Sequence, residues 1–144
     1  MTRPINFRLF YRLTKQVGNF IDRDQKYVVE LSDDARFTFQ LADPYWNRLL
    51  YKEFHYEPEI AAALHLIKDL DYTFLDLGAN YGFWSIMVSS AVFGAHRAIA
   101  VEPLGSDFDM LSRNWTLNDR RFRIRKEAIT EKSGREVEIR TDTS

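Results

Sequence analysis

The sequence has 144 residues, and its 20 Lys and Arg against 21 Asp and Glu leave a net charge of −1. This balance gives no reason to expect nucleic acid or an acidic membrane as a partner. There is no cysteine, which excludes disulfides and thiolate metal sites, and the three histidines lack ligand spacing, so no metal is expected. No apolar run reaches the roughly 18 residues of a membrane span, and the N-terminus lacks the apolar core of a secretory signal. We therefore predict a soluble, cytoplasmic protein.

The first 56 residues predict a helix followed by a β-hairpin. Apolar residues recur at helical spacing between Leu9 and Ile21, which indicates an amphipathic helix in residues 1–26. We expect it to pack on the domain or on a second copy, and a basic membrane-surface helix is the alternative. In residues 27–56, two β-prone runs on either side of a polar turn predict a hairpin, followed by a loop.

The remaining residues, 57–144, alternate between strand and helix patterns. Apolar residues from about Glu57 to Leu70 form a helical stripe, and Pro58 sits at a natural first-turn position. The alternation that follows predicts an α/β fold with a parallel sheet and right-handed crossovers. The expected strands are 73–77, 98–101, 122–129 and a short one at 136–140, and the expected helices are 83–93, stopped by Gly94, and 107–117.

The stretch FLDLGANYGFWS, residues 74–85, predicts a ligand site where the first parallel strand ends. Ligands of such sheets bind outside the carboxyl ends of the strands, and the next helix points its N-terminus at the same place. Gly78 and Gly82 let the backbone turn sharply and approach a ligand closely. Glu102 ends the next strand, near the spacing at which an acidic residue reaches a ribose in dinucleotide sites. A carboxylate can accept hydrogen bonds from both ribose hydroxyls.

Asp76 decides which adenosine-bearing ligand is expected. The pattern is D-x-G-x-x-x-G rather than the G-x-G-x-x-G of dinucleotide sites. A carboxylate beside the turn would repel the pyrophosphate of NAD, whereas it would attract the sulfonium and ammonium groups of S-adenosylmethionine. The alternative is that Asp76 only caps the turn or the helix.

Residues 75–82, LDLGANYG, resemble the first motif of FkbM-type S-adenosylmethionine-dependent methyltransferases, a hydrophobic strand followed by D-x-G-A-N-x-G. The resemblance covers roughly residues 27–140. It extends to Tyr56-Glu57-Pro58-Glu59, Val101-Glu102-Pro103, Asn114, Asn118, Ala128 and Ser133-Gly134.

The resemblance implies a Rossmann-like class I methyltransferase fold that methylates a hydroxyl on a sugar, glycan or secondary metabolite. In this reading Glu102 holds the ribose, and Glu127 and Ala128 lie near the adenine. The implied cofactor-binding residues are Tyr56, Asp76, Gly78, Ala79, Asn80, Gly82, Glu102, Pro103, Glu127 and Ala128.

The chain departs from the family in the size of its sheet. Complete class I methyltransferases have seven strands, whereas the pattern here is truncated after about three core parallel strands. Residues 57–144 would thus be a partial methyltransferase domain, and a cofactor-binding module without catalysis is the alternative. An NAD-binding Rossmann domain is a further, weaker one. A third strand left open would expose an apolar edge and favour self-association.

The general base for a hydroxyl acceptor is not evident from the sequence. The helix that begins near Glu57 starts at the same edge as Gly78, so Glu57 and His55 are the weak candidates. The alternatives are that Glu57 is a helix-start charge, Tyr56 a packing residue and His55 a solvated loop residue. Phe83 and Trp84 are expected to pack the first helix against the sheet rather than stack on adenine. The arginine-rich residues 120–126 predict a basic strand face, since the overall charge does not support a nucleic-acid patch.

Overall fold

The computed structural model describes residues 25–51, 53–132, 134 and 136–139. The apolar positions that predict the N-terminal helix lie outside these residues, so that helix stays a prediction. The division of the chain into units at residues 26 and 56 also stays a prediction.

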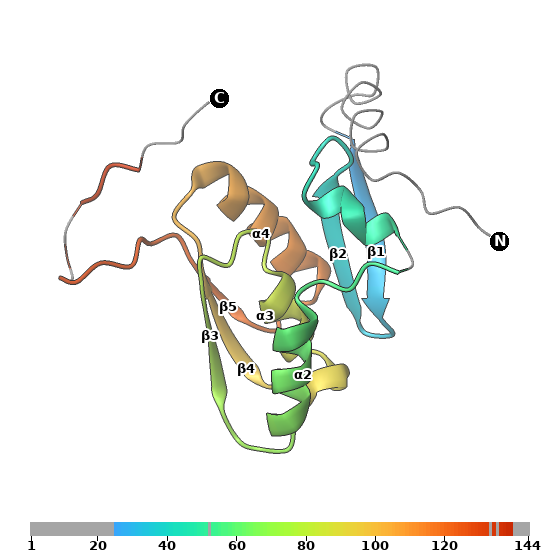
Figure 1. Ribbon diagram of the computed structural model, residues 1–144. Helices are drawn as coiled ribbons and strands as arrows, with labels where there is room; N and C mark the ends of the chain where they lie inside the picture. The colour runs from blue at the N-terminus through green and yellow to red at the C-terminus, as the bar shows by residue number, and fades with distance from the viewer. Residues whose placement is uncertain (1–24, 52, 133, 135, 140–144) are drawn as a thin grey trace.

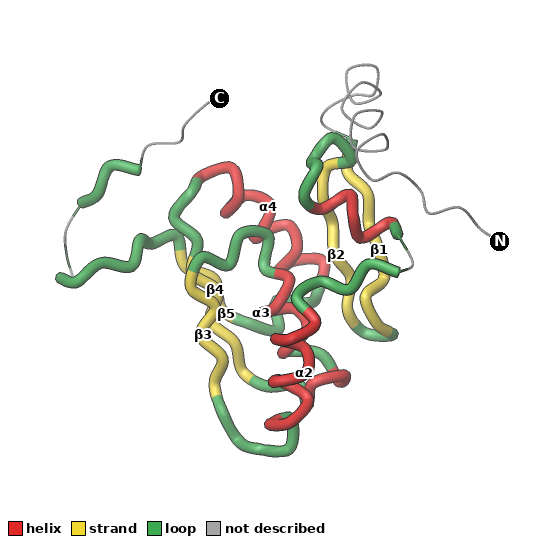
Figure 2. The backbone as a smooth tube through the Cα atoms, viewed as in Figure 1, coloured by secondary structure: helices red, strands yellow, loops and turns green. Residues whose placement is uncertain are grey.

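The described residues form two sheets with helices between them, as Figures 1 and 2 show. An antiparallel hairpin packs on one side of the helices α3 and α4, and a parallel sheet with the strand order β3-β4-β5 packs on the other. This arrangement confirms the predicted α/β class and is consistent with a Rossmann-like fold. The strands are β1 (Lys26–Ser32), β2 (Ala35–Gln40), β3 (Thr73–Leu77), β4 (Arg97–Val101) and β5 (Arg123–Arg125); the helices are η1 (Trp46–Leu50), α2 (Pro58–Ile67), α3 (Phe83–Val88), η2 (Ala91–Phe93) and α4 (Gly105–Leu117).

The core lies between the parallel sheet, the helices and the hairpin. Strand residues alternate between the two faces of a sheet, and Phe74, Ala98, Ala100 and Ile124 all face the helices. The hairpin contributes further aromatic and small side chains from β2 to the same core. Burying these side chains anchors the carboxyl ends of β3 and β4, where the candidate site lies.

Two asparagines attach the hairpin to α4. Asn114 accepts from Thr38 N at 2.7 Å and donates to Thr38 O at 3.1 Å, and Asn118 makes the same pair of bonds with Arg36 at 2.9 and 2.7 Å. Residues four apart on a helix rise about 6 Å, close to the spacing of about 6.6 Å between alternate strand residues. The two amides therefore bond the free edge of β2 as a neighbouring strand would. Both asparagines belong to the family resemblance, but the sequence did not predict that they bond β2.

Three predicted elements are shorter than expected, and a fourth is absent from the described residues. The helix expected from about Glu57 to Leu70 is α2, which ends at Ile67. The helix expected at 83–93 ends at Val88 and resumes as η2, because the Ser89 and Ser90 hydroxyls bond nearby helix carbonyls and Ser90 is extended. Gly94, with φ +99°, ends η2 as predicted. The strand expected at 122–129 is only β5, since β4 offers partners only up to Val101. Residues 136–139 form no strand, because no strand lies beside them to complete a ladder.

One face of the parallel sheet is left bare by the helices of the described residues. The exposed apolar side chains lie on β3, where Leu75 and Leu77 are 59% and 55% exposed. The strand order β3-β4-β5 places both β3 and β5 at an edge of the sheet. The open edge expected on the third parallel strand is therefore present among the described residues, and self-association through it stays a prediction.

Candidate functional site

A cavity of about 400 Å³ opens at the carboxyl end of β3. It is bounded by the start of α2, by β3 and the loop after it, and by the start of α3. Its ionisable side chains are Glu57, Asp76 and Tyr56, and it has neither lysine nor arginine. The residues that line it are Trp46, Tyr56, Glu57, Ile60, Phe74, Leu75, Asp76, Leu77, Gly78, Ala79, Asn80, Phe83 and Trp84.

The loop between β3 and α3 uses all its backbone amides within the protein. Gly78 N and Ala79 N both donate to Val101 O, at 2.9 and 3.0 Å, which ties the loop to the end of β4. The next three amides, those of residues 80–82, donate to Glu102 Oε2, Asn80 Oδ1 and Ala79 O. The loop is therefore held by a hydrogen bond at each of these five amides, and none of them is left to bind an anion.

The two glycines of the loop have different roles. Gly78 has φ +78°, and a Cβ added there would meet no atom within 4 Å, so the space in front of it is open to the cavity. Gly82 has φ +85°, but a Cβ there would lie 2.5 Å from Leu111 Cδ1. Gly82 does not line the cavity, and the close approach of α4 is the reason for a glycine at this position.

Asp76 caps α3 and also borders the cavity. Its Oδ2 accepts from Ser85 N at 3.1 Å and from Ser85 Oγ at 2.7 Å. No hydrogen bond among the described residues uses Oδ1. Burial raises the pKa of Asp76 above its ordinary value, the bonds from Ser85 oppose this, and the nearby Glu57 and Glu102 charges raise it further. A cation near Oδ1 would relieve this excess of negative charge.

Glu102 is buried and bonds the backbone of the loop. Only 4% of it is exposed, its Oε2 accepts from Asn80 N at 2.8 Å, and its Oε1 accepts from Leu104 N at 2.9 Å. The side chain does not line the cavity. A ribose bond from Glu102 would use the second lone pair of each oxygen, and the ribose assignment therefore stays a prediction.

Asn80 connects the loop to η1 and α4, two elements that the sequence did not predict to be near the site. With φ +50°, it accepts at Oδ1 from Trp46 Nε1 at 2.9 Å and donates from Nδ2 to Asp107 Oδ2 at 3.0 Å. Trp46 lies on η1, within the stretch predicted to be a loop. No local sequence signal joins these residues, because they are brought together only by the packing of η1 and α4 around the loop.

Glu57 is held in place at the cavity mouth. Its Oε2 accepts from Trp84 Nε1 at 2.6 Å, and its backbone has φ +42° at the start of α2. Tyr56 packs edge-on against Phe83, with ring centroids 4.7 Å apart, and its hydroxyl bonds that of Tyr45 at 2.8 Å. Burial raises the pKa of Tyr56, and the bond to Tyr45 and the Glu57 charge raise it further. Tyr56 is therefore a neutral wall of the cavity.

The structure divides the predicted site residues among several places. Besides Glu57, the cavity holds Tyr56, Asp76, Gly78, Ala79 and Asn80. Pro103, Glu127 and Ala128 line a separate hollow of about 640 Å³ together with later residues such as Ile129 and Val137. His55 is exposed and lines neither of the two. Phe83 and Trp84 are buried and pack α3, and both also line the cavity.

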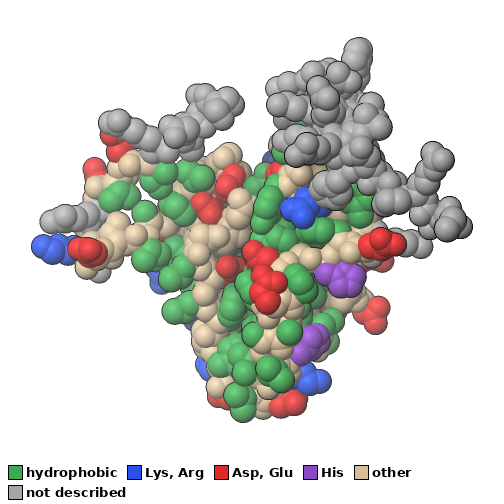
Figure 3. All heavy atoms as spheres, in the orientation of Figure 1, with side chains coloured by type: hydrophobic (Ala, Val, Ile, Leu, Met, Phe, Trp, Pro, Cys, Tyr) green, Lys and Arg blue, Asp and Glu red, His purple; other side chains and the backbone are tan. Residues whose placement is uncertain are grey.

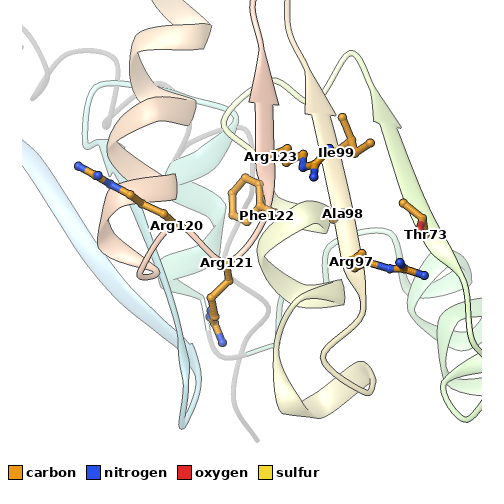
Figure 4. Close-up of a pocket in the computed structure, with 8 residues that line it drawn as sticks. All are labelled: Thr73, Arg97, Ala98, Ile99, Arg120, Arg121, Phe122 and Arg123. Carbon is orange, nitrogen blue, oxygen red and sulfur yellow. The ribbon is translucent and has the colours of Figure 1, made fainter.

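A third hollow, of about 430 Å³, lies at the opposite ends of the strands and is lined by arginines (Figure 4). Figure 4 shows that the guanidinium groups of Arg97, Arg120 and Arg121 point apart. Arg121 is bonded to Asp34 at 2.8 Å, and Arg120 lies over the Trp115 ring at 5.1 Å. The arginines therefore do not converge on a single anion.

Neither a metal cluster nor a membrane helix is found in the part of the chain that the structure describes. No three of its His, Asp and Glu side chains are grouped so that they could hold a metal ion. None of its helices is both long enough and apolar enough to cross a membrane.

Comparison with known proteins gives little similarity. No protein-family model matches the sequence, and no curated protein matches it. Among solved structures, the fold is similar to a crystal structure of P. horikoshii TYW2 in complex with MeSAdo, with 16% identity and a TM-score of 0.49. The match covers 88% of this chain and 50% of that one, so this chain spans about half the length of TYW2. Similarity at this level carries no argument about function.

Proposed function

We propose that the cavity at the end of β3 binds S-adenosylmethionine. The observation that carries the proposal is the chemistry of its walls. The loop amides of residues 78–82 are all bonded within the protein, and the only charged side chains of the lining are the carboxylates Glu57 and Asp76. Dinucleotide sites instead present free amides at a helix N-terminus to a pyrophosphate.

Electrostatics favours a cation in this cavity over an anion. Two unit charges about 4 Å apart interact by about 4 kcal/mol at an effective dielectric constant of 20. The sign of that energy is favourable for the sulfonium or ammonium of S-adenosylmethionine beside Asp76, and unfavourable for a phosphate. The open space in front of Gly78 admits the ligand to the loop. These features support S-adenosylmethionine over NAD.

The reaction proposed on this cofactor is methyl transfer to a hydroxyl of a sugar, glycan or secondary metabolite, as in FkbM-type enzymes. Its support is the resemblance of residues 75–82 and 101–103. Transfer from the sulfonium is an in-line displacement, in which alignment of the reactants contributes up to about 7–11 kcal/mol. Glu57 is the candidate base, because its carboxylate lines the cavity and Trp84 fixes its orientation.

A cofactor-binding module without catalysis is the second candidate. The observation in its favour is that no histidine lines the cavity and that Glu57 already accepts a bond of 2.6 Å from Trp84. A hydroxyl nucleophile usually needs a base that is free to take its proton. In this case the chain binds the cofactor, and no methyl transfer occurs.

Calorimetric titration of the 144-residue chain with S-adenosylmethionine, S-adenosylhomocysteine and NAD, each in turn, tests the proposal. We expect S-adenosylmethionine to bind and NAD not to bind. S-adenosylhomocysteine lacks the sulfonium charge, so its affinity relative to that of S-adenosylmethionine reports the contribution of the acidic wall. Binding of NAD, or no binding of S-adenosylmethionine, would overturn the proposal.

A further inference from the structure

The face of the parallel sheet that the helices leave bare combines an apolar centre with a cationic rim. Strand register places Leu75 beside Ile99 and Leu77 beside Val101, with their side chains on the face opposite to the core. Arg97, Arg123 and Arg125 belong to the same face, because they are in register with Thr73, Ile99 and Val101. Val101 is itself only 5% exposed and lies at the covered end of this face. We call the other six residues, Leu75, Leu77, Arg97, Ile99, Arg123 and Arg125, the bare face.

The charges of the bare face are only weakly compensated. Arg97 lies 3.5 Å from Asp71, with both side chains well exposed, and Arg125 lies 3.0 Å from Glu127. Exposed pairs of this kind contribute little. Arg123 has no ion pair among the described residues, and Figure 4 shows it beside Ile99 on the neighbouring strand. The surface therefore suits a partner that is apolar in the middle and acidic at its edges.

Parallel sheets are found almost only with both faces covered. Exposed apolar patches rimmed by polar residues mark interaction sites. Leu75 and Leu77, which are 59% and 55% exposed, therefore mark a surface where we expect a partner to bind.

The outer face of α2 and the turn after it has the complementary chemistry. Leu66 is 86% exposed and Leu70 is 60% exposed, and Ala62 and Ala63 lie on the same side at helical spacing. The acidic side chains that flank this stripe are Glu59 and Asp69, both exposed. Figure 3 shows hydrophobic side chains with acidic ones beside them over the lower part of the molecule, where Figure 1 places α2.

We propose that α2 of one copy of this chain covers the bare face of the next copy. Two bare faces against each other would bring arginines together. The helix predicted in residues 1–26 is also a poor cover, because its sequence carries Arg3, Arg8, Arg12 and Lys15. The α2 stripe offers leucines for Leu75 and Leu77, and carboxylates for Arg97 and Arg123.

This contact joins two different surfaces of the chain. A pair of copies joined in this way still has one unused surface of each kind, so further copies can add to it. Each copy presents both a bare face and an α2 stripe. A heterologous contact of this kind generates rings or open chains rather than an isologous dimer. The average mass should therefore rise with concentration.

Sedimentation velocity over a range of concentrations tests the proposal with two variants. Leu75→Glu places an acid on the bare face, and Leu66→Arg places a cation on the α2 stripe. We expect each variant alone to stay monomeric, because each lacks one of the two surfaces. A mixture of the two should give 1:1 dimers that do not grow, since each variant supplies the surface that the other has kept.

Leu50→Glu is the matched control, because Leu50 is 49% exposed on η1 and belongs to neither surface. It should associate as the unchanged chain does. Circular dichroism would check that all three variants keep the fold. Three outcomes would each overturn the proposal: the unchanged chain is monomeric, the Leu66→Arg variant associates by itself, or the mixture of the two variants stays monomeric. The first of these would indicate that a different protein covers the bare face.

Discussion

Asp76→Asn separates the proposed binding role of this side chain from its role as a helix cap. The substitution removes a charge and keeps the shape. An asparagine Oδ1 can still accept from Ser85 N and Ser85 Oγ, which now bond Asp76 Oδ2 at 3.1 and 2.7 Å. The cap should therefore survive, whereas the attraction for a sulfonium or ammonium group should be lost.

The size of the expected loss follows from the burial of the carboxylate. A hydrogen bond to a charged group contributes about 1.5–3 kcal/mol. Since about 1.4 kcal/mol corresponds to a factor of ten, the affinity for S-adenosylmethionine should fall about 10- to 150-fold. This hydrogen bond would come from the ammonium, which S-adenosylhomocysteine also carries, so the affinity for S-adenosylhomocysteine should fall as well. It should fall less, because only S-adenosylmethionine also loses the attraction between Asp76 and a sulfonium.

Stability should not fall with the affinity. The pKa of Asp76 is raised by burial, so the folded state favours the protonated form. A raised carboxyl pKa makes the fold less stable as the pH rises from the unfolded pKa through the folded one. At neutral pH the asparagine variant, which cannot ionise, should therefore be at least as stable as the unchanged chain.

Calorimetry with both ligands and a thermal melt at neutral pH measure these effects. Asp107→Asn is the control, because burial also raises the pKa of Asp107 and its Oδ2 bonds Asn80, yet it does not line the cavity. The control should bind as the unchanged chain does. Unchanged affinity in the Asp76→Asn variant, or equal losses in both variants, would refute the reasoning.

Three further substitutions test the framework of the site. Asn114→Ala should lower the free energy of unfolding by about 3 kcal/mol or more in urea titration. It leaves three backbone groups unpaired, the N–H and C=O of Thr38 and the C=O of Tyr81, at about 1–3 kcal/mol each; a loss below about 1 kcal/mol would contradict this. Gly82→Ala should cost about 1–3 kcal/mol, because its Cβ would overpack Leu111 and its φ of +85° is strained for alanine. The readout is a lower melting temperature, and an unchanged melting temperature would contradict both causes. Glu102→Ala should destabilise the chain and also weaken S-adenosylmethionine binding. The loss in binding free energy should be about 1.5–3 kcal/mol for each hydrogen bond lost to the ribose. A folded variant with unchanged affinity would rule out the ribose role.

The proposed self-association would connect the fold to the proposed function. Leu75 and Leu77 belong to the bare face and also line the cavity. A copy docked on the bare face would therefore lie next to the proposed cofactor. Sedimentation in the presence and absence of S-adenosylmethionine would show whether the two events are coupled.

The sequence by itself determined the order of the elements from α2 to β5 and the position of the candidate site. The first parallel strand begins and ends where its pattern predicted, at Thr73 and Leu77, and α2 starts at Pro58. Local chemistry is sufficient for such features, because side-chain periodicity and the backbone limits of glycine and proline act over a few residues. The same signals predicted the acidic glycine loop at the carboxyl end of a strand.

Only the tertiary structure decided what each polar side chain does. Glu102 bonds the loop backbone, Trp84 orients Glu57, and Asn114 bonds β2 across 76 positions of the chain. It also decided which apolar strand residues stay exposed, since Leu75 and Leu77 are more than half exposed whereas Val101, in register with Leu77, is buried. Contacts between distant segments depend on how the elements pack, and no local pattern in a single sequence records them.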